Sequence, residues 1–118
     1  MRTSYQSVVP FVTKDGSEIR ELMHPAVHGS RNQSLAEATV QPGATTALHR
    51  HIVTEEIYHI THGEGVMMLG DACFAVVAGD TICIVPGTPH CIANTGRSPL
   101  RIICSCAPAY AHDDTELL

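Results

Sequence analysis

Residues 49–56 read HRHIVTEE, so two histidines one residue apart are followed at once by two glutamates. Side chains alternate between the two faces of a β-strand, which puts His49 and His51 on one face and Arg50 on the other. Imidazoles spaced in this way can bind one cation together. The stretch therefore predicts a β-strand that supplies two ligands of a metal site.

The chain after His51 is expected to turn back over residues 52–55 and to bring one glutamate to the same cation. Glu55 and Glu56 are adjacent, so they face opposite sides of their strand and only one of them serves as a ligand. We expect that ligand to be Glu56. Tyr58 shares its face, where the hydroxyl orients a substrate or acts as an acid, or where the ring fills the core.

A third histidine is expected from residues 86–94, PGTPHCIAN, in which His90 follows a tight turn. Three nitrogens and one oxygen suit Fe(II), Mn(II), Ni(II), Cu(II) or Zn(II), and they leave one or two positions open for water or substrate. The alternative is a hydrogen-bonded cluster without metal, but burying these groups unpaired costs on the order of several kcal/mol. The predicted metal ligands are therefore His49, His51, Glu56 and His90.

Other polar residues near these positions receive weaker assignments. Asn94 shares the face of His90, where it either bonds a ligand residue or closes the following turn. His59 and His62 are expected at the surface. The five cysteines are expected to be free thiols, and Cys73 and Cys83 are expected to pack in the core.

Short apolar runs recur along the chain between residues that favour turns. They are spaced by about 8 to 12 residues, which is typical of an antiparallel sandwich or barrel. The runs are SVVPFVT (7–13), SLAEATV (34–40), EIYHI (56–60), GVMML (65–69), CFAVV (73–77), TICIV (81–85), HCIAN (90–94) and PLRIICSC (99–106). No helical period is sustained between residues 33 and 106, so we predict an all-β fold with minor helix at the termini, including a turn within 111–118.

Length and charge exclude several classes of protein. A chain of 118 residues holds a single core. The net charge of -5 and the scattered basic residues argue against a nucleic-acid partner. No apolar run approaches the roughly 20 residues of a membrane span, and the first residues lack a signal peptide, so no membrane partner and a cytoplasmic location are expected.

Two sets of spaced residues resemble the two motifs of the cupin superfamily. In the first motif a glycine is followed, after five residues, by H-x-H, then after three or four residues by a glutamate and after six more by a glycine. The residues at these spacings are Gly43, His49, His51, Glu56 and Gly63. In the second motif a glycine is followed, after five residues, by P-x-G, then after two residues by a histidine and after three more by an asparagine. The residues at these spacings are Gly79, Gly87, His90 and Asn94, and Val85 stands in place of the proline. The final segment is also similar to the tail of small single-domain bacterial cupins.

This resemblance implies an antiparallel jelly-roll β-barrel with the metal inside. We expect the barrel over residues 34–107, an N-terminal arm with strands over 1–33 and a C-terminal tail over 108–118. Small cupins commonly form dimers, and the apolar run at 7–13 would expose a strand edge to a second chain, so a homodimer is expected.

Cupin activities include dioxygenases, isomerases, epimerases, cyclases and decarboxylases, so the fold does not fix the reaction. Ala47, Ile60 and Ile92 are expected to give the site an apolar lining. We therefore expect an oxidoreductase of the dioxygenase type, or an isomerase or cyclase, that acts on a small, partly apolar organic molecule with Glu56 and Tyr58 as catalytic residues. The alternative is a non-enzymatic module that binds metal and a small ligand.

Overall fold

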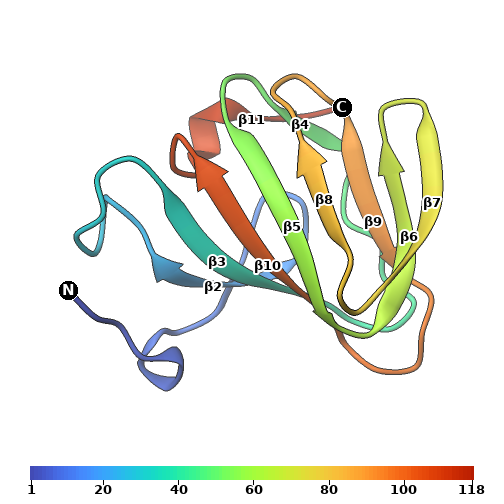
Figure 1. The fold of residues 1–118 in the computed structure, drawn as a ribbon, viewed down its shortest axis with the longest axis horizontal. Coiled ribbons are helices and arrows are strands. Elements are labelled where there is room, and N and C mark those ends of the chain that lie inside the picture. Colours follow the sequence, from blue (N-terminus) through green and yellow to red (C-terminus); the bar gives the residue numbers. More distant parts are fainter.

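Two antiparallel β-sheets pack face to face in a jelly-roll barrel (Figure 1), in agreement with the predicted all-β class. The computed structural model describes residues 1–118. The first sheet has the order β1 (Phe11–Val12), β2 (Glu18–Met23), β3 (Ser34–Val40), β10 (Leu100–Ala107), β5 (Glu55–His62) and β8 (Thr81–Ile84). The second has the order β11 (Thr115–Leu117), β4 (His49–His51), β9 (His90–Asn94), β6 (Glu64–Leu69) and β7 (Ala72–Val77).

The apolar core lies between the sheets because the strands alternate buried and exposed side chains. In β5 every second residue from Glu56 to Ile60 is buried, and β10 alternates in the same way. Tyr58 and Cys104 belong to the core and also line the cavity described below. The complete core cluster consists of Ala38, Val40, Tyr58, Ile60, Met67, Val76, Ile82, Ile84, Ile92, Leu100, Ile102 and Cys104.

The turn at Pro86 and Gly87 holds the start of β9 next to β4. Gly87 has a φ of +83°, in the left-handed region that favours glycine, and its amide donates a hydrogen bond to the carbonyl of His51 at 2.7 Å. β9 then pairs with β4 so that His90 lies opposite His49. One tight turn therefore fixes where two distant histidines meet.

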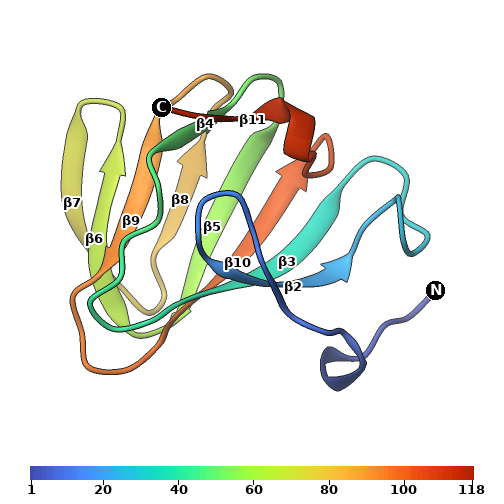
Figure 2. The same cartoon turned by 180° about the vertical axis from the view of Figure 1, so that it is seen from behind.

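Helical structure is confined to two short 3₁₀ turns, η1 (Tyr5–Ser7) and η2 (His112–Asp114). Neither comes near the length and apolar character that a membrane-spanning helix requires. Asp114 accepts hydrogen bonds from the amides of Val53 and Thr54 rather than capping a helix of its own. The chain after it forms β11 along β4, which Figure 2 shows from the other side.

Two expectations about local structure were wrong. The run at 7–13 forms only the two-residue strand β1, because Ser7 bonds back to Ser4 in η1 and Pro10 lacks an amide hydrogen. Cys73 and Cys83 are exposed rather than packed in the core, since they lie on the outer faces of the edge strands β7 and β8. The other three cysteines are buried free thiols, as expected.

Candidate metal centre

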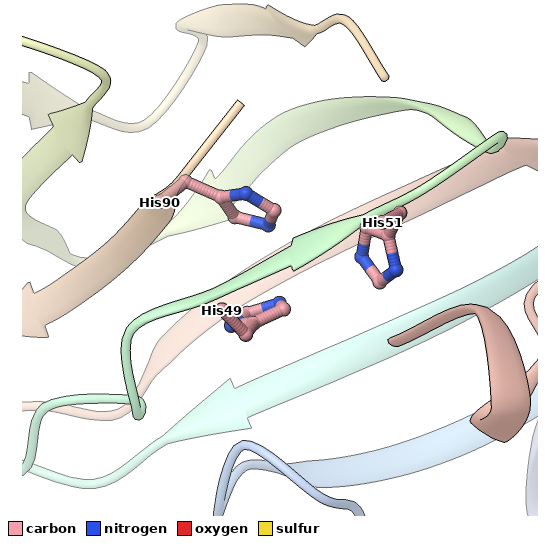
Figure 3. A group of neighbouring side chains, drawn as sticks. All are labelled: His49, His51 and His90. Atoms are coloured by element: carbon pink, nitrogen blue, oxygen red, sulfur yellow. The ribbon is translucent and has the colours of Figure 1, made fainter. Parts of the chain in front are cut away.

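Three histidines gather inside the barrel from two neighbouring strands (Figure 3). His49 and His51 come from β4 and His90 from the first position of β9. Their candidate ligand atoms all lie within 4.8 Å of one another. The three residues are 3%, 3% and 0% exposed, so water does not compete freely for their ring nitrogens.

The backbone fixes the protonation of two of these rings. The Nδ1 atom of His49 lies 2.8 Å from the carbonyl oxygen of Ala47, and Nδ1 of His90 lies 2.9 Å from the carbonyl oxygen of Thr88. A carbonyl oxygen only accepts hydrogen bonds, so each Nδ1 must carry the hydrogen. In the neutral ring the lone pair is then on Nε2, the atom that faces the centre.

The third ring is oriented by a threonine far along the chain. Nδ1 of His51 lies 3.1 Å from the hydroxyl oxygen of Thr115, and that hydroxyl donates its own hydrogen to the carbonyl of Ala111 at 3.0 Å. The Thr115 oxygen is therefore free to accept from Nδ1 of His51. No pattern in the sequence predicts this contact, since Thr115 reaches His51 only because β11 pairs with β4.

Glu56 approaches the same nitrogens from β5. Its Oε1 atom lies 3.1 Å from Nε2 of His51 and 3.7 Å from Nε2 of His90, while Oε2 accepts a hydrogen bond from the thiol of Cys106 at 3.3 Å. With neutral rings, these carboxylate and imidazole lone pairs face each other. A proton or a metal ion between them relieves the repulsion.

The free atoms of the centre fit a divalent transition metal ion. Nε2 of His90 is buried and has no hydrogen-bond partner, although its ring is held firmly from the other side. A buried polar atom without a partner is costly, and coordination would satisfy it together with its neighbours. Three imidazole nitrogens beside one carboxylate are a donor set that transition metals accept.

The surroundings of His49 and Glu56 shift their pKa values in the direction that metal binding needs. Burial and the nearby His90 lower the pKa of His49 below its ordinary value of 6.5, which favours the neutral ring. Burial by itself raises the pKa of Glu56, but the neighbouring imidazoles of His51 and His90 more than offset it and bring the pKa to about 2. The carboxylate therefore stays ionised.

A cavity of about 40 Å³ borders this cluster. Burial raises the pKa of Tyr58 well above 10, so its phenol stays protonated as a donor. The ring of Tyr58 lies with its centroid 6.1 Å from that of His90. The lining consists of Thr13, Asp15, Ser17, Ile19, Glu21, Ser34, Ala36, Ala38, His49, His51, Glu56, Tyr58, Cys104, Cys106, Tyr110 and Thr115.

Other sequence assignments are resolved by their contacts. Asn94 closes the turn that follows it, because its amide donates to the carbonyls of Val40 and Ser98 and its oxygen accepts from Gly96. His59 and His62 are exposed and bond to neighbours on the outer surface. The sequence reading missed Asp15 and Glu21, which reach the cavity from the N-terminal arm.

Comparison with known proteins supports this architecture. The model of the cupin domain family matches residues 36–106. An uncharacterized protein of Methanocaldococcus jannaschii is 51% identical over 118 residues, which cover 100% of this chain and 94% of that protein. The oxalate-binding protein of Thermotoga maritima is 30% identical over 86 residues, which cover 73% of this chain and 71% of that protein.

Solved structures share the fold at lower identity. A predicted oxalate decarboxylase of Thermotoga maritima superposes with a TM-score of 0.80 at 24% identity, covering 92% of this chain and 99% of its own. The nucleoside dehydratase Pac13 of Streptomyces has a TM-score of 0.80 at 17% identity, covering 100% of this chain and 90% of its own. At these identities the likeness concerns the fold alone.

Proposed function

Because the chain belongs to the cupin family, we propose that it is a mononuclear metal-dependent enzyme acting on a small, partly apolar organic molecule. The reaction is an oxidation of the dioxygenase type, or an isomerisation or cyclisation. One observation carries the proposal: three buried imidazoles, each held through Nδ1, bring their free nitrogens close together beside a cavity that His49 and His51 line.

His49, His51, His90 and Glu56 are the proposed ligands of one divalent ion of Fe, Mn, Ni, Cu or Zn. When bound, such an ion supplies Lewis-acid activation of a substrate oxygen and, for the redox-active metals, a path for electrons. The chain provides three neutral nitrogens and one anionic oxygen, and the hydrogen bonds at each Nδ1 keep the rings from rotating away.

Glu56 and Tyr58 are the proposed catalytic residues, because both line the cavity from β5. The Glu56 carboxylate stays ionised and is therefore able to accept a proton from a substrate. The Tyr58 phenol stays protonated and is able to donate a hydrogen bond or a proton. Acid and base would then lie one residue apart on a single rigid strand.

The size and lining of the cavity support a small substrate. Ile19, Ala36 and Ala38 line the cavity from β2 and β3 as its apolar part, together with Tyr58 and Tyr110. The volume of about 40 Å³ leaves room for a few atoms beyond the metal position.

A non-enzymatic module that holds a metal and a small ligand is the second candidate. It is favoured by the relative from Thermotoga maritima, which is 30% identical and is named an oxalate-binding protein. In such a module the histidines would serve only to hold the ligand through the metal.

Turnover separates the two candidates. Protein loaded with Fe(II) is mixed with a panel of small enols, thiols and diols while oxygen uptake and product formation are followed. Consumption that disappears in the His51→Ala variant supports the enzyme. A ligand that raises the melting temperature of the metal-loaded protein without being consumed supports the module.

A further inference from the structure

The N-terminal arm forms one wall of the cavity through every second residue. Thr13, Asp15 and Ser17 line it from the turn between β1 and β2, and Ile19 and Glu21 line it from one face of β2. The turn that carries Asp15 is tied down, because the Asp15 carbonyl accepts from the amide of Ala47 at 2.8 Å and Lys14 donates to the carbonyl of Thr115 at 2.7 Å. The wall is therefore a built part of the site.

Asp15 directs one carboxyl oxygen at the metal centre. Its Oδ1 accepts hydrogen bonds from the hydroxyl of Thr13 at 2.8 Å and from the amide of Ser17 at 2.9 Å. Its Oδ2 lies 3.8 Å from Nε2 of His49, a ring that is 3% exposed and has its hydrogen on Nδ1. Two acceptors thus face each other across a gap, which a cation with a donating ligand would fill.

Glu21 presents an unsatisfied oxygen to the cavity. Its Oε1 is buried and has no hydrogen-bond partner. His24 lies 3.9 Å away, but its Nε2 donates instead to the carbonyl of Tyr110 at 2.7 Å and its Nδ1 accepts from the amide of Ala26. Burial, the main cause, raises the pKa of the Glu21 carboxyl, which is the cost of holding a charge there without a donor.

No lysine or arginine side chain lines the cavity to balance these groups. Three carboxyl groups line it, from Asp15, Glu21 and Glu56. A bound divalent metal would be neutralised by two of them, and a ligand with two carboxylates would then face repulsion from the arm. A ligand that brings hydrogen-bond donors would instead satisfy Oε1 of Glu21, which lacks a partner, and would face Oδ2 of Asp15.

We propose that Asp15 and Glu21 select a small ligand that donates hydrogen bonds, an alcohol or a primary amine, and disfavour dicarboxylates. The inference rests on the proposed metal site. A hydroxyl at the metal would donate to Oδ2 of Asp15, and an ammonium or second hydroxyl would donate to Oε1 of Glu21. Both residues are specificity-determining, and neither is needed to hold the metal.

Two probes of similar size test the proposal on protein loaded with Co(II), whose visible absorption reports ligands entering the metal site. Ethanolamine offers a hydroxyl and an ammonium, whereas oxalate offers two carboxylates. Dissociation constants are measured for both probes with the wild type, Asp15→Asn and Glu21→Gln. Glu64→Gln is the matched control, because Glu64 is exposed at the start of β6, outside the cavity lining.

The two probes should respond in opposite directions. Each arm variant should raise the dissociation constant of ethanolamine by about tenfold, because one charged hydrogen bond is lost. It should lower the dissociation constant of oxalate several-fold. Glu64→Gln should change neither constant by more than about twofold, as expected for a distant surface charge. Metal analysis during the titrations verifies that oxalate has not removed the cobalt.

The failures of the two proposals are distinguishable. If cobalt binds but the arm variants bind both probes like the wild type, the selective role of Asp15 and Glu21 is overturned and the metal site stands. If the wild type binds no cobalt, both proposals fall. Asn at position 15 keeps the Oδ1 acceptor for Thr13 and Ser17, and Glu21→Gln carries the test by itself if Asp15→Asn does not fold.

Discussion

The imidazole nitrogens that face away from the centre are as important to it as those that face inward. His49 and His90 are held by backbone carbonyls, which no substitution removes, but His51 depends on the single hydroxyl of Thr115. Loss of that acceptor would leave the ring free to rotate or to change tautomer. The weakest orientation in the site is therefore the one made by a side chain.

Thr115→Val should lower metal affinity by about tenfold while keeping the shape of the residue, because partners of ligand histidines are typically worth 10- to 100-fold. Competition with a fluorescent chelator measures the change. Thr81→Val is the control, since Thr81 bonds the exposed His59 in the same way. Equal affinities for the two variants would show that Thr115 does not orient His51.

Acidification should destabilise the metal-free protein in two ranges. His49 has a folded pKa below 6.5, so the stability that its neutral form gives is lost as the pH falls below 6.5. Glu56 has a folded pKa of about 2 against an ordinary 4.5, so its contribution is lost between pH 4.5 and 2. Urea unfolding across this range measures both steps, and Glu56→Gln should lack the lower one.

Bound metal should stabilise the folded protein less as the pH falls, because protons compete with the metal for the imidazole nitrogens. The melting temperatures of metal-loaded and metal-free protein should converge between roughly pH 7 and pH 5, given reference histidine pKa values near 6.5. Each tenfold rise in the metal dissociation constant removes about 1.4 kcal/mol of stabilisation while metal is in excess. A gap that stays constant over this range would contradict coordination by titrating histidines.

At the scale of elements, the turn glycines set the strand register that brings the ligands together. Gly63 joins β5 to β6 with a φ of +89°, and a Cβ atom there would lie 2.9 Å from the carbonyl oxygen of Pro99. Gly79 has a similar φ of +98° but open space around it. A substitution at Gly79 therefore measures the cost of the backbone conformation alone, and one at Gly63 measures that cost together with the cost of a steric clash.

Gly79→Ala should lower the free energy of unfolding by about 1 to 2 kcal/mol, the cost of a left-handed residue with a Cβ atom. Gly63→Ala should cost about 1 to 3 kcal/mol more, because the backbone at Pro99 must also move. Denaturant titrations of both variants measure the difference. Equal losses would mean that the turn at Gly63 relaxes freely.

Local pattern predicted most of the strands and the relation between the histidines. SLAEATV and HCIAN coincide with β3 and β9, and both runs lie between residues that favour turns. The run at 7–13 was predicted too long, because the local bonds of η1 and the missing amide hydrogen of Pro10 confine the strand to β1. The strand β11 was not predicted, since the contacts of Asp114 depend on neighbours far along the chain. Asp15 and Glu21 were missed for the same reason, because only the folded arm brings them to the cavity.

At the scale of the whole molecule, the edge of the six-stranded sheet is uncovered. β1 ends that sheet, and its two residues Phe11 and Val12 are 48% and 70% exposed. An exposed apolar edge strand invites pairing with another chain. This feature supports the predicted homodimer through the N-terminal arm.

Light scattering at micromolar concentration should therefore give a mass of twice 12.7 kDa. Val12→Lys should shift the population towards the monomer, because a charge at the edge opposes pairing. Val77→Lys on β7, the edge of the other sheet, should leave the mass unchanged. A monomer mass for the wild type would refute this assembly.

The metal content of protein purified without a histidine tag tests the central claim most directly. Elemental analysis should find about one transition metal ion per chain in the wild type, as a single buried three-histidine centre predicts. His51→Ala should retain less than about a tenth of it, because one of four proposed ligands is lost. His59→Ala should retain it all. Full occupancy in His51→Ala, or a wild type that takes up no metal even when Fe(II), Zn(II) or Mn(II) is supplied, would contradict the account.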